Sequence, residues 1–284
     1  MAGRLWPACF FLAGHHPVPL SAGPVLPFTT MHFPWWLYPL LFATGLGAGF
    51  IDAIAGGGGL ITVPVLLATG LPPQVAIATN RFQSSFGTAI ATWSYHRAGL
   101  LAWRTLGVGV AFTALGAVAG AFALKHTDAT WLKRLIPFLL LAIAALLWFK
   151  PDLGGRPHPA RWPATVFAVV FGLVLGFYDG FFGPGTGTFW TLACVLLLGL
   201  DLRAATAHTK VMNLTSNVAS VVVYLAAGIV RFDLGLTMAA GQLIGGRLGS
   251  RVVVKGGAKA VRPVLLTVVL TLTAKLLWDN FHHP

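Results

Sequence analysis

Residues Gly49–Gly59 read Gly-Phe-Ile-Asp-Ala-Ile-Ala-Gly-Gly-Gly-Gly, an aspartate followed by a glycine run inside an apolar segment. A similar stretch, Gly176–Gly187, reads Gly-Phe-Tyr-Asp-Gly-Phe-Phe-Gly-Pro-Gly-Thr-Gly. Asp179 follows Asp52 by 127 residues, close to half of the 284-residue chain. Glycine lowers helix stability and adopts positive φ readily, so both stretches predict a helix that breaks just after its aspartate. Their recurrence predicts a paired site.

The composition indicates an all-α polytopic membrane protein. Apolar residues make up 56% of the chain and charged residues only 9%, whereas soluble domains carry about 25% charged residues. The net charge of +12 comes from basic residues that stand singly between apolar runs. This distribution suits anionic lipid and membrane topology better than nucleic acid. Two cysteines predict neither a disulfide framework nor a cysteine metal site.

Ten apolar segments follow an N-terminal tail, residues 1–33, which is expected to have no function. Most segments have about the 20 residues that a spanning helix needs. The second and the seventh are about half as long, and each follows a glycine break. Tryptophans near several segment ends are typical of the membrane interface. The segments are 35–55, 60–70, 74–96, 103–124, 131–149, 163–182, 187–199, 203–227, 234–254 and 261–279.

The two halves of the chain align with each other. After the glycine stretches, an offset of 129 residues places Arg81 on Lys210 and Tyr95 on Tyr224. A single offset that holds over such a distance indicates a duplication of five segments. The predicted organisation is a first transmembrane repeat at 34–150, a linker at 151–162 and a second repeat at 163–284.

The short segments decide whether the repeats are parallel or inverted. If they cross the membrane there are ten crossings, and the copies are inverted; if they are re-entrant there are eight, and the copies are parallel. With ten crossings, one side carries ten loop lysines and arginines and the other carries five. Cytoplasmic loops are enriched in these residues. We therefore expect ten crossings, an inverted five-plus-five repeat, and both termini outside.

Inverted repeats with interrupted helices are typical of transporters that bind substrate near the membrane midplane. The N-terminus of a short helix offers unpaired backbone N–H groups to an anion, and glycine lets them approach closely. An alternative is that the glycines only permit close packing between helices. The candidate ligands in the two loops are Gly57, Gly58, Gly59, Gly185, Thr186 and Gly187.

Arg81 and Lys210 lie inside apolar segments at equivalent positions of the two repeats. A cation inside a membrane is costly unless it is paired, so it indicates a functional site. We expect these cations to complement an anionic substrate; the alternative is that Asp52 and Asp179 neutralise them structurally. The polar neighbours expected to bind substrate with them are Asn80, Gln83, Thr209, Asn213 and Asn217.

The two aspartates have two candidate roles. Asp52 and Asp179 either cap the broken helices or carry coupling protons, and His208, beside Lys210, is a further candidate proton carrier. No cofactor or metal site is expected.

The residues also resemble a known family. The glycine break after Asp52, the stretch Gly70–Arg81 (Gly-Leu-Pro-Pro-Gln-Val-Ala-Ile-Ala-Thr-Asn-Arg) and the duplication are similar to the TauE/SafE family of sulfite and organosulfonate exporters. The resemblance covers about residues 37–279. It implies export of sulfite, taurine-derived sulfonates or sulfoacetate across the bacterial inner membrane. Arg81 aligns with Lys210 rather than with a second arginine, so the two half-sites are not expected to bind identically.

The expected function is therefore that of a secondary transporter which alternates access to an anion bound between the repeats. A passive anion channel, or a carrier for another small anion, is the alternative. An enzyme is not expected, because the chain has no glutamate for a His-Glu-x-x-His motif and no Gly-x-Ser-x-Gly motif. Apart from the anion and membrane lipid, a second copy of the chain is a possible partner. Gly116-x-x-x-Gly120 and Gly245-x-x-x-Gly249 are packing motifs that suit either contacts within one subunit or a dimer.

Overall fold

A computed structural model describes residues 31–128, 130–131 and 159–256, and these residues form helices and no strand. Eight predicted segments are confirmed as helices, with bounds within about two residues of those expected. The expected segments 131–149 and 261–279 lie almost entirely outside the described residues, as do most of the tail and of the linker. The helices are α1 (Leu37–Ala55), α2 (Gly58–Ala68), α3 (Pro73–Arg97), α4 (Trp103–His126), α6 (Ala164–Phe181), α7 (Thr186–Leu198), α8 (Leu202–Ala226) and α9 (Phe232–Gly256).

Three of the described helices are long and apolar enough to cross a membrane: α1, α6 and residues 106–126 of α4. The helices α3, α8 and α9 are longer, with 25 residues each, but they carry polar residues along their length. Many of these polar side chains are buried against other helices instead of facing outward, among them Thr79, Gln83, Thr209, Asn217 and Gln242. The composition and the apolar helices together make this a multi-pass membrane protein.

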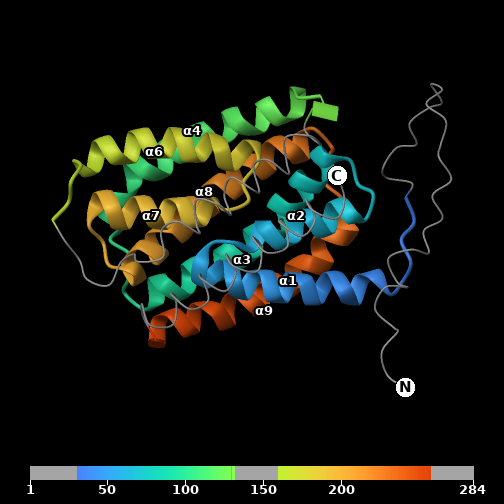
Figure 1. The fold of residues 1–284 in the computed structure, drawn as a ribbon, viewed down its shortest axis with the longest axis horizontal. Coiled ribbons are helices and arrows are strands. Elements are labelled where there is room, and N and C mark those ends of the chain that lie inside the picture. The colour runs from blue at the N-terminus through green and yellow to red at the C-terminus, as the bar shows by residue number, and fades with distance from the viewer. Residues whose placement is uncertain (1–30, 129, 132–158, 257–284) are drawn as a thin grey trace, which may run out of the picture. The chain divides into compact units, whose positions relative to one another are not determined.

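Two close helix pairs form opposite edges of the bundle, α1 with α9 and α4 with α6 (Figure 1). Glycines allow the close approach. A methyl group at Gly245 or Gly249 would clash with a backbone carbonyl oxygen of α1, at Leu46 or Phe50. The two helices of each pair run parallel to each other, because residues later in one helix contact residues later in the other. The glycine motifs therefore serve packing within one subunit.

Glycines also allow the close approach of α4 and α6. A methyl group at Gly116 or Gly120 would clash with backbone of α6, and one at Gly180 would clash with the carbonyl of Ala117 on α4. Under the alignment of the two halves, α4 corresponds to α9 and α6 to α1. The first helix of each half therefore packs against the fourth helix of the other half.

Helices α3 and α8 cross the centre of the bundle in opposite directions. Thr92 of α3 donates to the carbonyl of Lys210 (3.1 Å), whereas Thr88, one turn earlier, accepts from Asn217 of α8 (3.3 Å). Each helix also anchors the break in its own half through a buried tyrosine. The hydroxyl of Tyr95 donates to the carbonyl of Ala53 (2.7 Å), and that of Tyr224 to Gly180.

The two glycine breaks meet at this centre. Gly56 ends α1 in the left-handed region (φ 78°), and Gly183 and Gly185 have φ values of 90° and 83° before α7 begins. A methyl group at Gly56 would lie 2.6 Å from the Cα of Gly187, and one at Gly59 would lie 3.2 Å from the Cα of Pro184. Only small residues permit this backbone contact between the halves.

Candidate functional site

Two ion pairs inside the helix bundle connect the halves of the chain. The guanidinium of Arg81 on α3 lies 2.7 Å from the carboxylate of Asp179 on α6. The ammonium of Lys210 on α8 lies 2.9 Å from the carboxylate of Asp52 on α1. Arg81 and Lys210 are equivalent positions of the two halves, and so are Asp52 and Asp179. Each half therefore supplies the cation for the other half's aspartate.

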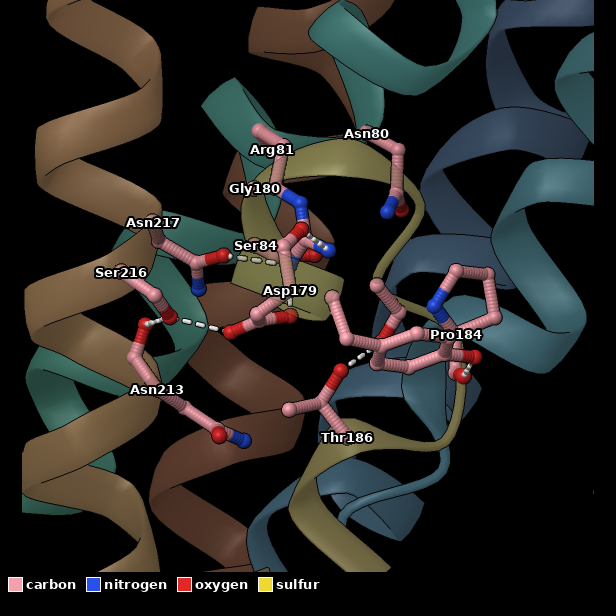
Figure 2. Close-up of polar contacts among 12 residues, drawn as sticks. Asn80, Arg81, Ser84, Asp179, Gly180, Pro184, Thr186, Asn213, Ser216 and Asn217 are labelled. Carbon is pink, nitrogen blue, oxygen red and sulfur yellow. Dashed lines mark hydrogen bonds and ion pairs between the residues drawn. The ribbon is translucent and has the colours of Figure 1, made fainter. Parts of the chain in front are cut away.

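Asp179 is held on several sides (Figure 2). Its carboxylate accepts from Arg81 and from the hydroxyl of Ser216, and its backbone carbonyl accepts a second bond from the same guanidinium. Asn217 accepts from Arg81 at 2.8 Å and so fixes the guanidinium from α8. A methyl group at Gly183 would overlap the guanidinium, so the positive-φ glycine creates the space that Arg81 occupies.

Asp52 has fewer partners. Its carboxylate accepts from Lys210 and, at 3.3 Å, from the backbone N–H of Gly58 at the start of α2. This second bond provides a partner for the first backbone N–H of the short helix. The Asp52 side chain is 14% exposed, whereas that of Asp179 is 2% exposed. The two half-sites are thus unequal in their hydrogen bonding and in their access to water.

A small polar cavity lies between these groups. Its volume is about 20 Å³, which is room for about one water molecule. Among the described residues, Arg81 Nε and Asn213 Oδ1 are buried and have no hydrogen-bond partner. Buried polar atoms nearly always have partners, so the cavity suits a polar occupant. It is lined by Asp52, Gly56, Gly59, Asn80, Arg81, Ser84, Thr88, Asp179, Gly183, Gly185, Gly187, Asn213 and Asn217.

Residues 41–276 match the sulfite exporter TauE/SafE family. This chain belongs to the TauE/SafE family. A "probable membrane transporter protein" of Haemophilus influenzae is 41% identical over 87% of this chain and 97% of its own length. The "probable membrane transporter protein YfcA" of Escherichia coli K12 is 39% identical over 86% of this chain and 91% of its own. The "probable membrane transporter protein ORF9" of a Sinorhizobium species is 42% identical over 87% of this chain and 94% of its own length. The comparison with solved structures found no match.

The match to TauE/SafE agrees with the resemblance read from the glycine break after Asp52 and the stretch Gly70–Arg81. The relatives are named as probable membrane transporters, and the described part of this chain is helical with three apolar helices long enough to span a membrane. Among the described residues, no three histidine, cysteine or aspartate side chains lie close enough together to hold a metal ion.

Most of the residues predicted from sequence lie at or next to the small polar cavity. Those that line it are Asp52, Gly59, Asn80, Arg81, Asp179, Gly185, Gly187, Asn213 and Asn217. Three other predicted residues do not line the cavity. The hydroxyl of Thr209 is hydrogen-bonded to that of Thr191 (3.1 Å). Gln83 donates to Asn80 (2.9 Å), and Thr186 donates to the carbonyl of Gly183 (2.6 Å). Gly57 is the N-cap of α2, and Gly58, its first residue, donates its backbone N–H to the carboxylate of Asp52. Lys210 reaches the site through Asp52.

Four lining residues were not among the predicted ligands: Gly56, Gly183, Ser84 and Thr88. The repeat alignment contains the signal that would have found them. Gly56 aligns with Gly183 within the two glycine stretches. At the later offset, Ser84 aligns with Asn213 and Thr88 with Asn217, both of which were predicted.

His208 lies in a different environment. Its Nδ1 is 3.3 Å from the sulfur of Cys194, and its side chain borders a larger, mainly apolar cavity of about 260 Å³ between α4, α6, α7 and α8. Phe167, Trp190 and Met212 line the same cavity. The structure therefore places His208 apart from the ion pairs.

Proposed function

We propose that this protein is a secondary transporter that exports a small sulfur-containing anion by alternating access, with the anion bound between the two halves. Sulfite, taurine-type sulfonates and sulfoacetate are the proposed cargo. The observation that carries the proposal is the pair of reciprocal ion pairs, Arg81–Asp179 and Lys210–Asp52, at the meeting point of two broken helices. The name of the matching family supports the choice of anion.

We further propose that the two halves form an inverted repeat of five segments each, in the bacterial inner membrane, with periplasmic termini. The opposite directions of the equivalent helices α3 and α8 support this arrangement. The reciprocal packing of α1 with α9 and of α4 with α6 supports it too. In transporters of this kind, one repeat moves against the other around a central site.

The size of the cavity supports a carrier over a passive channel. A volume of about 20 Å³ is too small for a sulfonate, since it holds about one water molecule. The anion can enter only if the halves separate and at least one ion pair opens. The cation of the opened pair then exchanges its carboxylate for the anion's oxygens, and the backbone N–H groups of the glycine loops are available as further donors.

The test is uptake of sulfite, taurine, sulfoacetate and isethionate into proteoliposomes that contain the purified protein. We expect saturable uptake of at least one of these compounds. Arg81→Ala and Lys210→Ala should each abolish it, whereas Arg247→Ala, which removes an exposed cation from α9, should leave it unchanged. Removing one partner of a buried ion pair destabilises a protein by about 3–5 kcal/mol, so the amount of folded protein must be matched between samples.

Three outcomes would redirect the proposal. Uptake that survives both alanine variants would make the cations structural partners of the aspartates only. Flux that never saturates would favour the passive channel. Uptake of none of these compounds would overturn the proposed transport of sulfur-containing anions.

A further inference from the structure

The charges of the central site cancel. Arg81 and Lys210 contribute two positive charges, and Asp52 and Asp179 contribute two negative charges. A bound anion would leave this buried site with an excess negative charge, which is costly in a low-dielectric interior. The addition of one proton together with the anion would restore neutrality. The site therefore needs a group that can accept a proton when the anion arrives.

The structure distinguishes between the two carboxylates. Asp179 is nearly inaccessible and is held by Arg81 and Ser216, and its cation cannot give up a proton. Asp52 is more exposed, borders the cavity, and is held by one ammonium and one long backbone bond. Protonation of Asp52 would break the fewest contacts.

Few other titratable groups near Asp52 could accept that proton in its place. The charged and titratable groups that face it are Lys210 from α8, Arg81 and the Tyr95 hydroxyl from α3, and Asp179 across the cavity. Helix α2 has no titratable side chain. The only titratable side chain of α7 is Cys194, which contacts His208. The cations of α9, at Arg247, Arg251 and Lys255, are exposed.

We propose that Asp52 takes up a proton from water as the anion binds, so that the anion and the proton cross the membrane together. This rests on the transport function proposed above. The protonated carboxyl no longer needs the ammonium of Lys210, whose N–H groups then bind the anion, while Arg81 stays paired with Asp179 as the fixed contact between the halves. On the other side the anion leaves, Asp52 returns its proton to water, and the ion pair with Lys210 forms again. For a singly charged anion this cycle moves no net charge.

The decisive experiment compares anion flux with proton flux in proteoliposomes. Isethionate is the probe, because a sulfonate of a strong acid does not itself release or bind protons near neutral pH. In the native protein we expect about one proton to accompany each isethionate, and the apparent Kd for isethionate to rise about tenfold per unit of increasing pH, as uptake of one proton requires. Asp52→Asn, which is permanently uncharged, should still bind and exchange isethionate, but without proton movement and with its pH dependence lost.

Asp233→Asn is the matched control, since Asp233 forms a separate ion pair with Arg231 at the start of α9 (2.6 Å). It should keep proton coupling. Proton movement that persists in Asp52→Asn, or isethionate transport by the native protein without protons, would overturn the inference and leave the transport function standing. If the native protein moves no anion of the panel, the transport function fails and the inference fails with it.

A second measurement needs no variant. Addition of isethionate to the purified native protein in weakly buffered detergent solution should remove about one proton per bound anion from the medium. Isethionate binding without proton uptake would overturn the inference even if Asp52→Asn does not fold.

Discussion

At the scale of single residues, the space for the Arg81 guanidinium depends on Gly183. This glycine has a φ of 90°, and a methyl group there would overlap the guanidinium. We expect Gly183→Ala to displace Arg81 from Asp179, to lower stability by about 1–3 kcal/mol through overpacking, and to abolish anion uptake. Thermal unfolding and proteoliposome flux measure the two effects.

Gly70→Ala separates the clash from the backbone strain. Gly70 has a similar φ of 86°, but a methyl group there would meet no described atom within 4 Å. This variant should show only the strain of the left-handed conformation, about 1–2 kcal/mol, and should retain uptake. If the two variants behave alike, the contact of Gly183 with Arg81 has no special role.

The sequence predicted the charged residues of the site better than the hydroxyl residues. Arg81, Lys210, Asp52 and Asp179 stand out because charges in apolar segments are rare. The two aspartates were named as alternative partners of the cations, but which aspartate pairs with which cation did not follow from the sequence, because sequence spacing does not show which helices lie side by side. Ser84 was not predicted as a ligand, because hydroxyl side chains are common in membrane helices and bond to their own backbone.

At the scale of helices, the close α4–α6 contact depends on Gly120. A methyl group there would clash with the carbonyl of Phe177 and with the backbone nitrogen of Phe181. We expect Gly120→Ala to push the two helices apart and to destabilise the protein by about 1–3 kcal/mol, as measured by thermal unfolding in detergent.

Gly107 provides the comparison within the same helix. It is exposed, and a methyl group there would meet no described atom within 4 Å. Gly107→Ala should be neutral or stabilising by up to about 1 kcal/mol, because alanine is the better helix former. A similar loss of stability in both variants would contradict the role of glycine in this helix contact.

Helix positions followed from the sequence because long apolar runs, glycine breaks and flanking prolines mark them locally. The pairing of α1 with α9 and of α4 with α6 did not follow from the sequence, because a small-residue motif permits close packing without indicating which helix packs against it. From the sequence alone, Gly116 and Gly245 are compatible with a dimer contact as well as with an internal contact. In the structure both lie against backbone atoms of a neighbouring helix of the same chain.

At the scale of the whole molecule, alternating access requires the two glycine breaks to separate. A Cβ atom at residue 59 would lie 3.6 Å from the Cβ of Pro184, which is within the usual range for a disulfide. In a background without Cys9 and Cys194, we expect Gly59→Cys combined with Pro184→Cys to form a disulfide between the halves. Oxidation should block anion uptake, because the cavity of about 20 Å³ can then no longer open.

Comparison of the oxidised and the reduced form of this one variant removes any effect of the substitutions themselves. A reductant should restore uptake to the level of the unoxidised double variant, and each single cysteine variant should be insensitive to oxidation. Uptake that continues with the disulfide fully formed would mean that the halves do not part at this contact. The anion would then need a route that leaves Gly59 and Pro184 in contact. This outcome would contradict the proposal that one half moves against the other at this point.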